Sequence, residues 1–279
     1  MNRVKQLIEL AKSDPKRIVL PEEGDSRVAE AVKHIKKKKI AHIVPLENSG
    51  GDVLSSAADM VKRGEADGFV AGAEHMSKDV IRAAMRCFGV NHSVGVISGA
   101  FLIEIEDCNY GENGFFIFTD CAVNPLPSAK QLARIAVSGG DLLKELFDIK
   151  PKIAFLTYSS YGSAEGESID RVRAALPIVK GKRPDFLVDG ELQLDAAIIP
   201  DIQKRKVPDS PLDGQANVLV FPSLDAGNAT YKAIERLGKA RAVGPALLGL
   251  NKACSDLSRG CSADDIVATV ALTVVRAKT

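Results

Sequence analysis

The residue types that could do chemistry are concentrated in residues 244–265, which combine glycines, a hydroxyl, a fixed cation and a pair of carboxylates. Ser258 and Arg259 are adjacent there, and Ser262 is followed three residues later by Asp265. That spacing predicts a capping box at the start of an apolar helix. The N–H groups and dipole of a helix start attract anions, and a neighbouring arginine adds positive charge. The stretch therefore predicts a glycine-punctuated loop that binds a phosphate or another anion.

The same pattern also has a purely structural interpretation. A Ser-x-x-Asp sequence at a helix start is usually only a cap, and acidic side chains there also complement the helix dipole. Local pattern therefore leaves both interpretations open.

Composition limits what the chain can be. It has 279 residues, of which 46% are hydrophobic, so it can bury a large core in one or two domains. Its 37 Lys and Arg nearly balance its 36 Asp and Glu, which argues against a nucleic-acid or membrane-surface partner. Five cysteines without paired spacing argue against a disulfide framework and a zinc ribbon. With no signal peptide and no apolar run long enough to span a membrane, we expect a cytoplasmic protein.

The elements that must position these residues alternate between strand-like and helix-like patterns. This alternation predicts an α/β fold with a mostly parallel sheet or two such sheets. Strands are predicted at 17–21, 40–46, 68–72, 93–105, 114–119, 152–158, 186–189 and 217–221. Helices are predicted at 4–12, 26–38, 53–63, 78–88, 129–147, 168–180, 192–202, 229–238 and 266–277, and residues 48–51 are predicted to be a loop.

Ligands of such folds lie beyond the carboxyl ends of the strands. The residues predicted to follow three strands, 159–164, 189–191 and 224–228, are polar and rich in glycine, so each could present amides or hydroxyls to an anion. Such residues are also what any strand-to-helix turn requires. The chain has neither a G-x-G-x-x-G fingerprint nor a Walker loop, which argues against the usual dinucleotide dehydrogenases and P-loop kinases.

Taken together, seven segments resemble motifs of the phosphate acetyltransferases (phosphotransacetylases), in the same order and over nearly the whole chain. The segments are 19–22, 64–68, 120–125, 189–197, 217–222, 225–228 and 256–262. The resemblance implies two α/β/α domains with mostly parallel sheets and an interdomain cleft, as in isocitrate and isopropylmalate dehydrogenases. We place residues 1–105 and 253–279 in one domain and 106–252 in the other. The same resemblance also implies a homodimer that interconverts acetyl-CoA plus phosphate with CoA plus acetyl phosphate.

The resemblance also implies roles for individual residues. Ser258 and Arg259 would hold the phosphoryl group, and Asp265 would take the proton of the CoA thiol. The other residues expected to bind substrate are Arg82, Asn124, Ser159, Ser160, Gly162, Ser163 and Lys252. CoA, acetyl phosphate and phosphate would be the small-molecule partners, with no tightly bound cofactor and no metal ligand from the protein.

The chain departs from the family pattern in three places. After Leu46 it lacks a βα unit, because only residues 47–52 bridge to the next helix. The family's Lys-Pro-x-Asn-Asp is changed at Ala253 and Ser255, and Tyr161 replaces a family lysine. Each change could weaken activity or alter the preferred acyl group.

Three functional hypotheses, each from a different class of protein, are compatible with these features. The first is the acetyltransferase, with phosphate butyryltransferase as a close variant. The second is a non-catalytic, acetyl-CoA-binding regulatory relative, against which the retained Ser258, Arg259 and Asp265 argue. The third is a metal-dependent β-decarboxylating dehydrogenase, whose aspartate cluster and hydride-carrier motif are not found in the sequence.

Overall fold

The computed structural model describes residues 2–46 and 52–277, which form two compact units. The central unit is one continuous stretch, Val96–Ala242, and the terminal unit combines Asn2–Gly95 with Val243–Thr279. The units thus divide the chain earlier than the predicted boundaries after residues 105 and 252. The first difference arises because residues 98–104 pair with a strand of the central unit.

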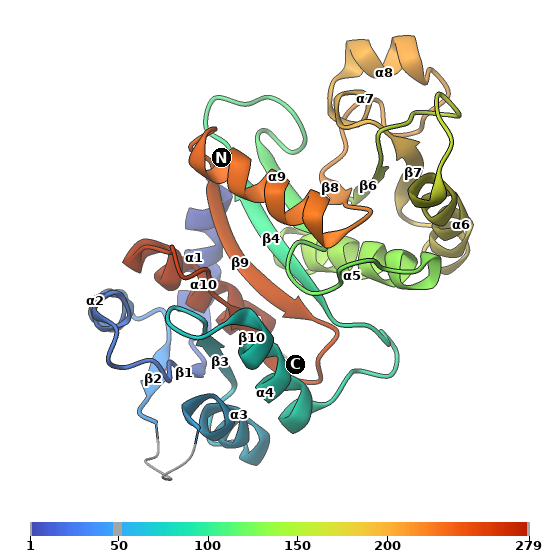
Figure 1. Cartoon of the computed structure of the whole chain (residues 1–279). Coiled ribbons are helices and arrows are strands. Elements are labelled where there is room, and N and C mark those ends of the chain that lie inside the picture. The colour runs from blue at the N-terminus through green and yellow to red at the C-terminus, as the bar shows by residue number, and fades with distance from the viewer. Residues whose placement is uncertain (1, 47–51, 278–279) are drawn as a thin grey trace. The chain divides into compact units, whose positions relative to one another are not determined.

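The terminal unit contains five helices and five strands among the described residues (Figure 1). They are α1 (Arg3–Ser13), β1 (Arg17–Val19), α2 (Ser26–Lys38), β2 (His42–Val44), α3 (Val53–Arg63), β3 (Gly68–Ala71), α4 (Ser77–Phe88), β9 (Arg241–Leu248, entering from the central unit), β10 (Ala253–Asp256) and α10 (Ala263–Arg276). The strand order is β2-β1-β3-β10-β9, with β9 antiparallel to β10 and the other pairs parallel.

Helices cover both faces of β3, the central strand of this unit. A Cβ on Gly68 would lie 3.0 Å from the side chain of Thr273 on α10, so this residue faces α10. The next residue, Phe69, packs edge-to-face on Phe88 of α4, with ring centroids 5.9 Å apart. Successive strand residues point to opposite faces, so α10 and α4 lie on opposite sides of the strand. The terminal unit is therefore an α/β/α sandwich, with α1 and α2 packed beside α10 and α3 beside α4.

The central unit has the same kind of architecture. It contains β4 (Ser98–Glu104), β5 (Phe115–Thr119), α5 (Ala129–Phe147), β6 (Lys152–Leu156), α6 (Glu167–Lys182), β7 (Leu187–Leu192), α7 (Leu194–Ile198), α8 (Pro200–Lys206), β8 (Val218–Val220) and α9 (Leu224–Arg236). The strand order is β4-β5-β8-β6-β7, parallel except for the β4–β5 pair.

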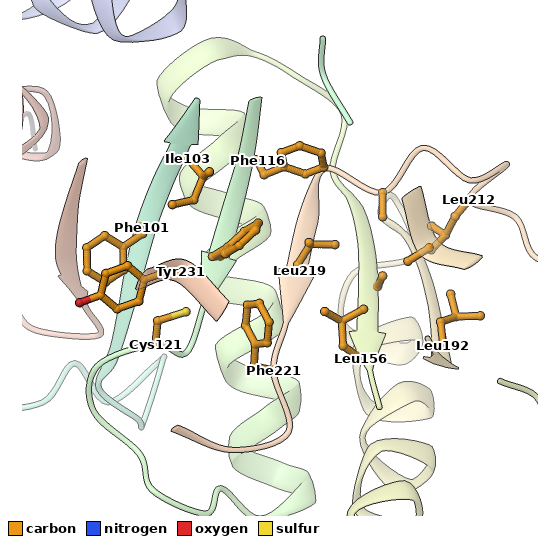
Figure 2. Close-up of a cluster of buried hydrophobic side chains, with 14 of the residues drawn as sticks. Phe101, Ile103, Phe116, Cys121, Leu156, Leu192, Leu212, Leu219, Phe221 and Tyr231 are labelled. Atoms are coloured by element: carbon orange, nitrogen blue, oxygen red, sulfur yellow. The ribbon is translucent and has the colours of Figure 1, made fainter. Parts of the chain in front are cut away.

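Two packed faces sandwich these strands as well. On one face, a Cβ on Gly139 of α5 would meet the side chains of Thr119, Val218 and Ile117. On the other face, aromatic side chains form the cluster shown in Figure 2, where Phe101 stacks on Tyr231 of α9 with ring centroids 4.1 Å apart. Burying such aromatic and branched side chains supplies the main stabilisation of this unit.

The structure confirms the α/β class with mostly parallel strands and corrects several predicted elements. Residues 244–248 and 253–256 are strands rather than loop. Residues 192–202 do not form one helix, because β7 runs to Leu192 and Pro200 starts α8 as its first residue. The predicted strand at 93–105 starts only at Ser98, since residues 91–95 form a turn.

Two of the three predicted polar turns are not turns. Residues 189–191 continue β7, and residues 224–228 are the first turns of α9 because Ser223 caps that helix by accepting from the Ala226 N–H. The predicted loop at 48–51 lies outside the described residues. No helix in the described parts of the chain is long and apolar enough to cross a membrane.

Candidate active site

Ser258 and Arg259 lie in a tight turn after the carboxyl end of β10. The Cys261 N–H donates to the Ser258 carbonyl at 2.9 Å, and the Gly260 N–H donates to Ser258 Oγ at 3.3 Å. The Arg259 residue is exposed. The turn therefore presents a hydroxyl and a guanidinium directly ahead of the α10 start.

Asp265 closes the capping box that the sequence predicts at this helix start. Its Oδ2 accepts from the backbone N–H of Ser262 at 2.9 Å and from the Ser262 hydroxyl at 2.8 Å. The Ser262 Oγ in turn accepts from the Asp265 N–H at 3.2 Å. The structure thus brings Ser258, Arg259 and Asp265 together at one strand–turn–helix junction, where the helix dipole favours an anion.

A buried carboxylate organises the adjacent loop. Glu22 follows β1, and its side chain is 1% exposed. Its two oxygens accept from the backbone N–H groups of four successive residues, Gly72, Ala73, Glu74 and His75, at 2.8–2.9 Å. Burial would raise the pKa of Glu22, but these hydrogen bonds outweigh it and hold the pKa below its usual value. Glu22 therefore fixes the loop between β3 and α4 as an ionised, acceptor-only group.

Arg27 ties that loop to the Ser258–Arg259 turn. Its Nη1 donates to the carbonyls of Arg259 at 2.7 Å and Cys261 at 3.1 Å, and its Nη2 donates to the Ala73 carbonyl at 2.8 Å. Asp25, the N-cap of α2, pairs with the same guanidinium at 2.6 Å. One arginine thus sets the backbone position of the turn that carries Arg259.

Asp256, the last residue of β10, is a second buried acid at the carboxyl ends of the strands of the terminal unit. It is 2% exposed, and its Oδ1 has no hydrogen-bond partner. Burial raises the pKa of Asp256 to about 7, and the charge of Glu22 acts in the same direction. Gly72 passes so closely that a Cβ there would clash with Asp256 Oδ1 and would lie 2.8 Å from the Leu257 backbone. The ends of β3 and β10 are therefore packed without space for a side chain between them.

Of the other predicted site residues in the terminal unit, Arg82 lies near this edge and Lys252 does not. Arg82 is on α4, which follows the Glu22-bound loop, and its Nη1 pairs with Asp79 Oδ1 at 3.1 Å. Lys252 is exposed and immediately precedes β10, whereas Ser258 follows that strand. Lys252 and Ser258 are consequently at opposite ends of β10.

The predicted serine-rich turn of the central unit is built around Glu191. The Gly162 N–H donates to Glu191 Oε1 at 2.8 Å, Ser159 Oγ lies 3.3 Å from the same oxygen, and Arg173 donates to both oxygens at 2.8 Å. Burial would raise the pKa of Glu191, but the Arg173 and Gly162 hydrogen bonds lower it to about 2. Next to Gly162, Tyr161 donates its hydroxyl to Asp189 Oδ2 at 2.6 Å.

Several predicted substrate ligands in this unit already have internal partners. Ser159 and Ser160 are buried, and their hydroxyls accept from the N–H groups of Ala164 at 3.1 Å and Gln193 at 2.9 Å. Ser163 is exposed, and its Oγ accepts from the Ser160 N–H at 3.0 Å. Asn124 donates its amide to the Ile97 carbonyl at 2.7 Å and also to Asp120. Substrate contacts by these residues stay a prediction.

Sequence reasoning assigned no role to Glu22, Arg27, Arg173, Glu191 or Asp256. The three acids among them lie inside the family-like segments 19–22, 189–197 and 256–262, but only the last of these segments contains residues that had been assigned roles. Arg27 carried a signal of its own, because a cation in the first turn of a helix opposes the helix dipole and needs another reason to be there.

The fold and the site define a class: a protein of two α/β/α units in which a turn carrying a hydroxyl and a guanidinium precedes a helix whose first turn carries a carboxylate. Within the described residues, no group of three or more His, Cys, Asp or Glu side chains is arranged to hold a metal ion.

Comparison with known proteins identifies the family. A profile described as phosphate acetyl/butaryl transferase matches residues 3–50 and 46–274. The phosphate acetyltransferase of Thermoanaerobacterium thermosaccharolyticum is 38% identical over 330 aligned positions that cover 100% of both chains. That of Clostridium acetobutylicum is 45% identical over 88% of this chain and 73% of its own. A phosphotransacetylase structure from Streptococcus pyogenes superposes with a TM-score of 0.87 at 34% identity, covering 99% of this chain and 98% of that one.

The chain belongs to the phosphate acetyl/butaryl transferase family. The 330 positions aligned to the Thermoanaerobacterium protein exceed the chain's 279 residues, and the two profile matches meet at residues 46–50. Both facts agree with the loss of a βα unit after Leu46.

Proposed function

We propose that this chain is a phosphate acetyltransferase that interconverts acetyl-CoA plus phosphate with CoA plus acetyl phosphate. In the direction of acetyl-CoA synthesis, the thiol sulfur of CoA attacks the acetyl carbonyl carbon. A carbon–sulfur bond forms, the bond from that carbon to the phosphate oxygen breaks, and phosphate leaves with the bonding electrons. The thiol proton passes to Asp265.

The observation that carries this proposal is the junction between β10 and α10, in a chain that belongs to this family. Ser258 and Arg259 precede the helix start, and Asp265 belongs to its capping box. A guanidinium can donate to two phosphoryl oxygens at once and stabilises the charge that develops on the leaving phosphate. A carboxylate close to that turn can accept the proton of an attacking thiol.

The timing of proton transfer follows from ordinary acidities. A free aspartate carboxyl has a pKa of about 3.9 and a free thiol about 8.5, so complete transfer before attack is uphill by roughly 6 kcal/mol. Two donors from Ser262 already bind Asp265 Oδ2. Asp265 therefore acts as a base while the sulfur–carbon bond forms, so that no free thiolate accumulates.

The proposal includes acetyl as the acyl group, because the relatives described above are named for it. It also includes a cytoplasmic homodimer that binds CoA as a substrate, holds no tightly bound cofactor and uses no protein-bound metal.

The test is the consumption of CoA thiol by the purified protein. Thiol should disappear when acetyl phosphate is supplied and persist when acetate and phosphate replace it, and activity should survive exhaustive chelation. Arg259→Ala protein is the matched control. A folded wild-type protein that consumes no thiol with acetyl phosphate would overturn the assignment. If chelation abolished the activity and zinc restored it, the proposal that no protein-bound metal is used would be wrong.

A further inference from the structure

The imidazole of His75 is held in one orientation by Glu22. His75 Nδ1 lies 2.8 Å from Glu22 Oε1, and the Glu22 side chain is 1% exposed while that of His75 is 34% exposed. Glu22 also accepts from four backbone N–H groups, and its lowered pKa keeps it ionised. Because an ionised carboxylate has no hydrogen to donate, His75 Nδ1 must carry the hydrogen of this bond. Nε2 is then the ring nitrogen available to a ligand.

His75 lines a polar surface pocket of the terminal unit. The pocket has a volume of about 280 Å³ and is also lined by Arg82 and Arg86 of α4 and by Asp52 and Ser55 at the start of α3. Two arginines one helical turn apart and an imidazolium are the donors expected of a site for a phosphate group.

The two carboxylates of this pocket are already hydrogen-bonded within the protein. Asp52 caps α3, with its Oδ2 accepting from the Ser55 N–H at 3.1 Å and from the Ser55 hydroxyl at 2.8 Å. Asp79 Oδ1 accepts from Arg82 at 3.1 Å. The charge of Asp79 is thus partly offset by Arg82, Asp52 is held as the cap of α3, and Arg82 keeps further N–H groups for a ligand.

We propose that His75 is a ligand-binding residue of this pocket, and that its imidazolium donates Nε2–H to a phosphate group of CoA beside Arg82 and Arg86. Glu22 is the positioning residue, because it fixes both the ring and the loop that carries it. This inference rests on the proposed function for the identity of the ligand. It adds a residue and an orienting carboxylate to a pocket in which the sequence pointed only to Arg82.

Two substitutions of His75 separate ligand contact from loop support. The side-chain amide of His75→Asn can replace Nδ1 as the donor to Glu22 but has nothing at the position of Nε2. His75→Gln can reach the position of Nε2 but loses the donor to Glu22. Glu22→Gln is unsuitable as a first test, because one end of its amide would direct N–H groups at backbone N–H groups that now donate to Glu22.

The experiment measures direct binding of adenosine 3′,5′-bisphosphate, the phosphorylated end of CoA, together with the KM for CoA, the kcat and the melting temperature. For His75→Asn we expect affinity for the bisphosphate to fall about tenfold or more, as for a lost charge-assisted contact. The KM for CoA should rise by a similar factor, and kcat and melting temperature should change little. The exposed His92→Asn in the same unit is the control and should leave all four unchanged.

Unchanged bisphosphate binding by a stable His75→Asn would overturn the proposal. So would a result in which His75→Asn lowers the melting temperature and kcat as much as His75→Gln does, because that pattern belongs to loop support alone. Bisphosphate binding needs no turnover, so a protein that binds it through His75 but transfers no acetyl group would contradict the proposed function without contradicting this site.

Discussion

Replacing Asp256 by asparagine would show how ionisation of this buried carboxyl, next to the Ser258–Arg259 turn, affects the stability of the protein. Burial raises the pKa of Asp256 to about 7, whereas in the unfolded chain it should titrate near its ordinary 3.8. Between these values the unfolded chain releases the proton and the folded protein keeps it, so the free energy of unfolding should fall as pH rises. Below this window Asp256 is protonated in both the folded and the unfolded chain. Above it Asp256 is ionised in both, and the folded protein bears the full cost of the buried charge.

The size of the effect follows from the pKa difference. The rise from 3.8 to about 7 is roughly three units, and at about 1.4 kcal/mol per unit the loss of stability reaches at most about 4 kcal/mol. Asp256→Asn has the same shape and cannot ionise. The variant should therefore be more stable than wild type at pH 8 by up to that amount, less the penalty for any amide N–H left without an acceptor.

Urea unfolding of wild type and Asp256→Asn between pH 4 and pH 8 gives the measurement. Subtracting the free energy of unfolding of wild type from that of the variant at each pH removes the contribution of every other carboxyl. Glu30→Gln, at an exposed position on α2, controls for loss of an acidic charge. We expect the difference to favour the variant increasingly as pH rises to about 7 and then to level off. A difference that stays constant across this range would refute the assignment of a proton to Asp256.

Three further predictions concern the site and its support. Arg259→Lys should be markedly impaired and Arg259→Ala worse, with kcat/KM for acetyl phosphate lower by roughly tenfold to more than a hundredfold; an unchanged kcat/KM in Arg259→Ala would contradict the phosphoryl contact. Asp265→Asn should fold normally and lose kcat by about a hundredfold or more, as for a general base; a cap-only role predicts instead normal turnover in Asp265→Asn and a lower melting temperature in Asp265→Ala. Glu191, with its pKa lowered to about 2, should stabilise the central unit above its ordinary pKa, and this stabilisation should be lost as pH falls toward 2; acid unfolding of Glu191→Gln should lack that component, and an identical acid profile would contradict it.

Most helices and strands could be read from apolar periodicity, because helix-covered parallel strands give short continuous apolar runs. The elements predicted wrongly are those in which a local sequence signal differs from the hydrogen-bonded structure that the residues adopt. Gly244-Pro245 was interpreted as part of a loop, yet these residues lie in β9, which pairs with β10. Ser223 was not recognised as an N-cap, so the first turns of α9 were taken for a loop.

The candidate site was predictable only in part. The capping box at Ser262 and Asp265 has a fixed spacing and could be found directly. Glu22 could not, because the four N–H groups that it binds are about fifty positions away and belong to the backbone, which side-chain patterns do not report. Lys252 and Ser258 are close in sequence, but the intervening β10 separates them along the strand direction.

The discontinuous make-up of the terminal unit has a consequence for the order in which the protein folds. Helix α10 packs on α1, α2 and β3, so the core of this unit joins residues from both ends of the chain. Contacts of such high sequence separation form slowly because the loop-closure entropy must be overcome first. The central unit is one continuous segment, so it can form its core during synthesis while α1 to α4 still lack the helix that completes theirs. Until α10 emerges from the ribosome, the apolar face that it covers is exposed to chaperones and to aggregation.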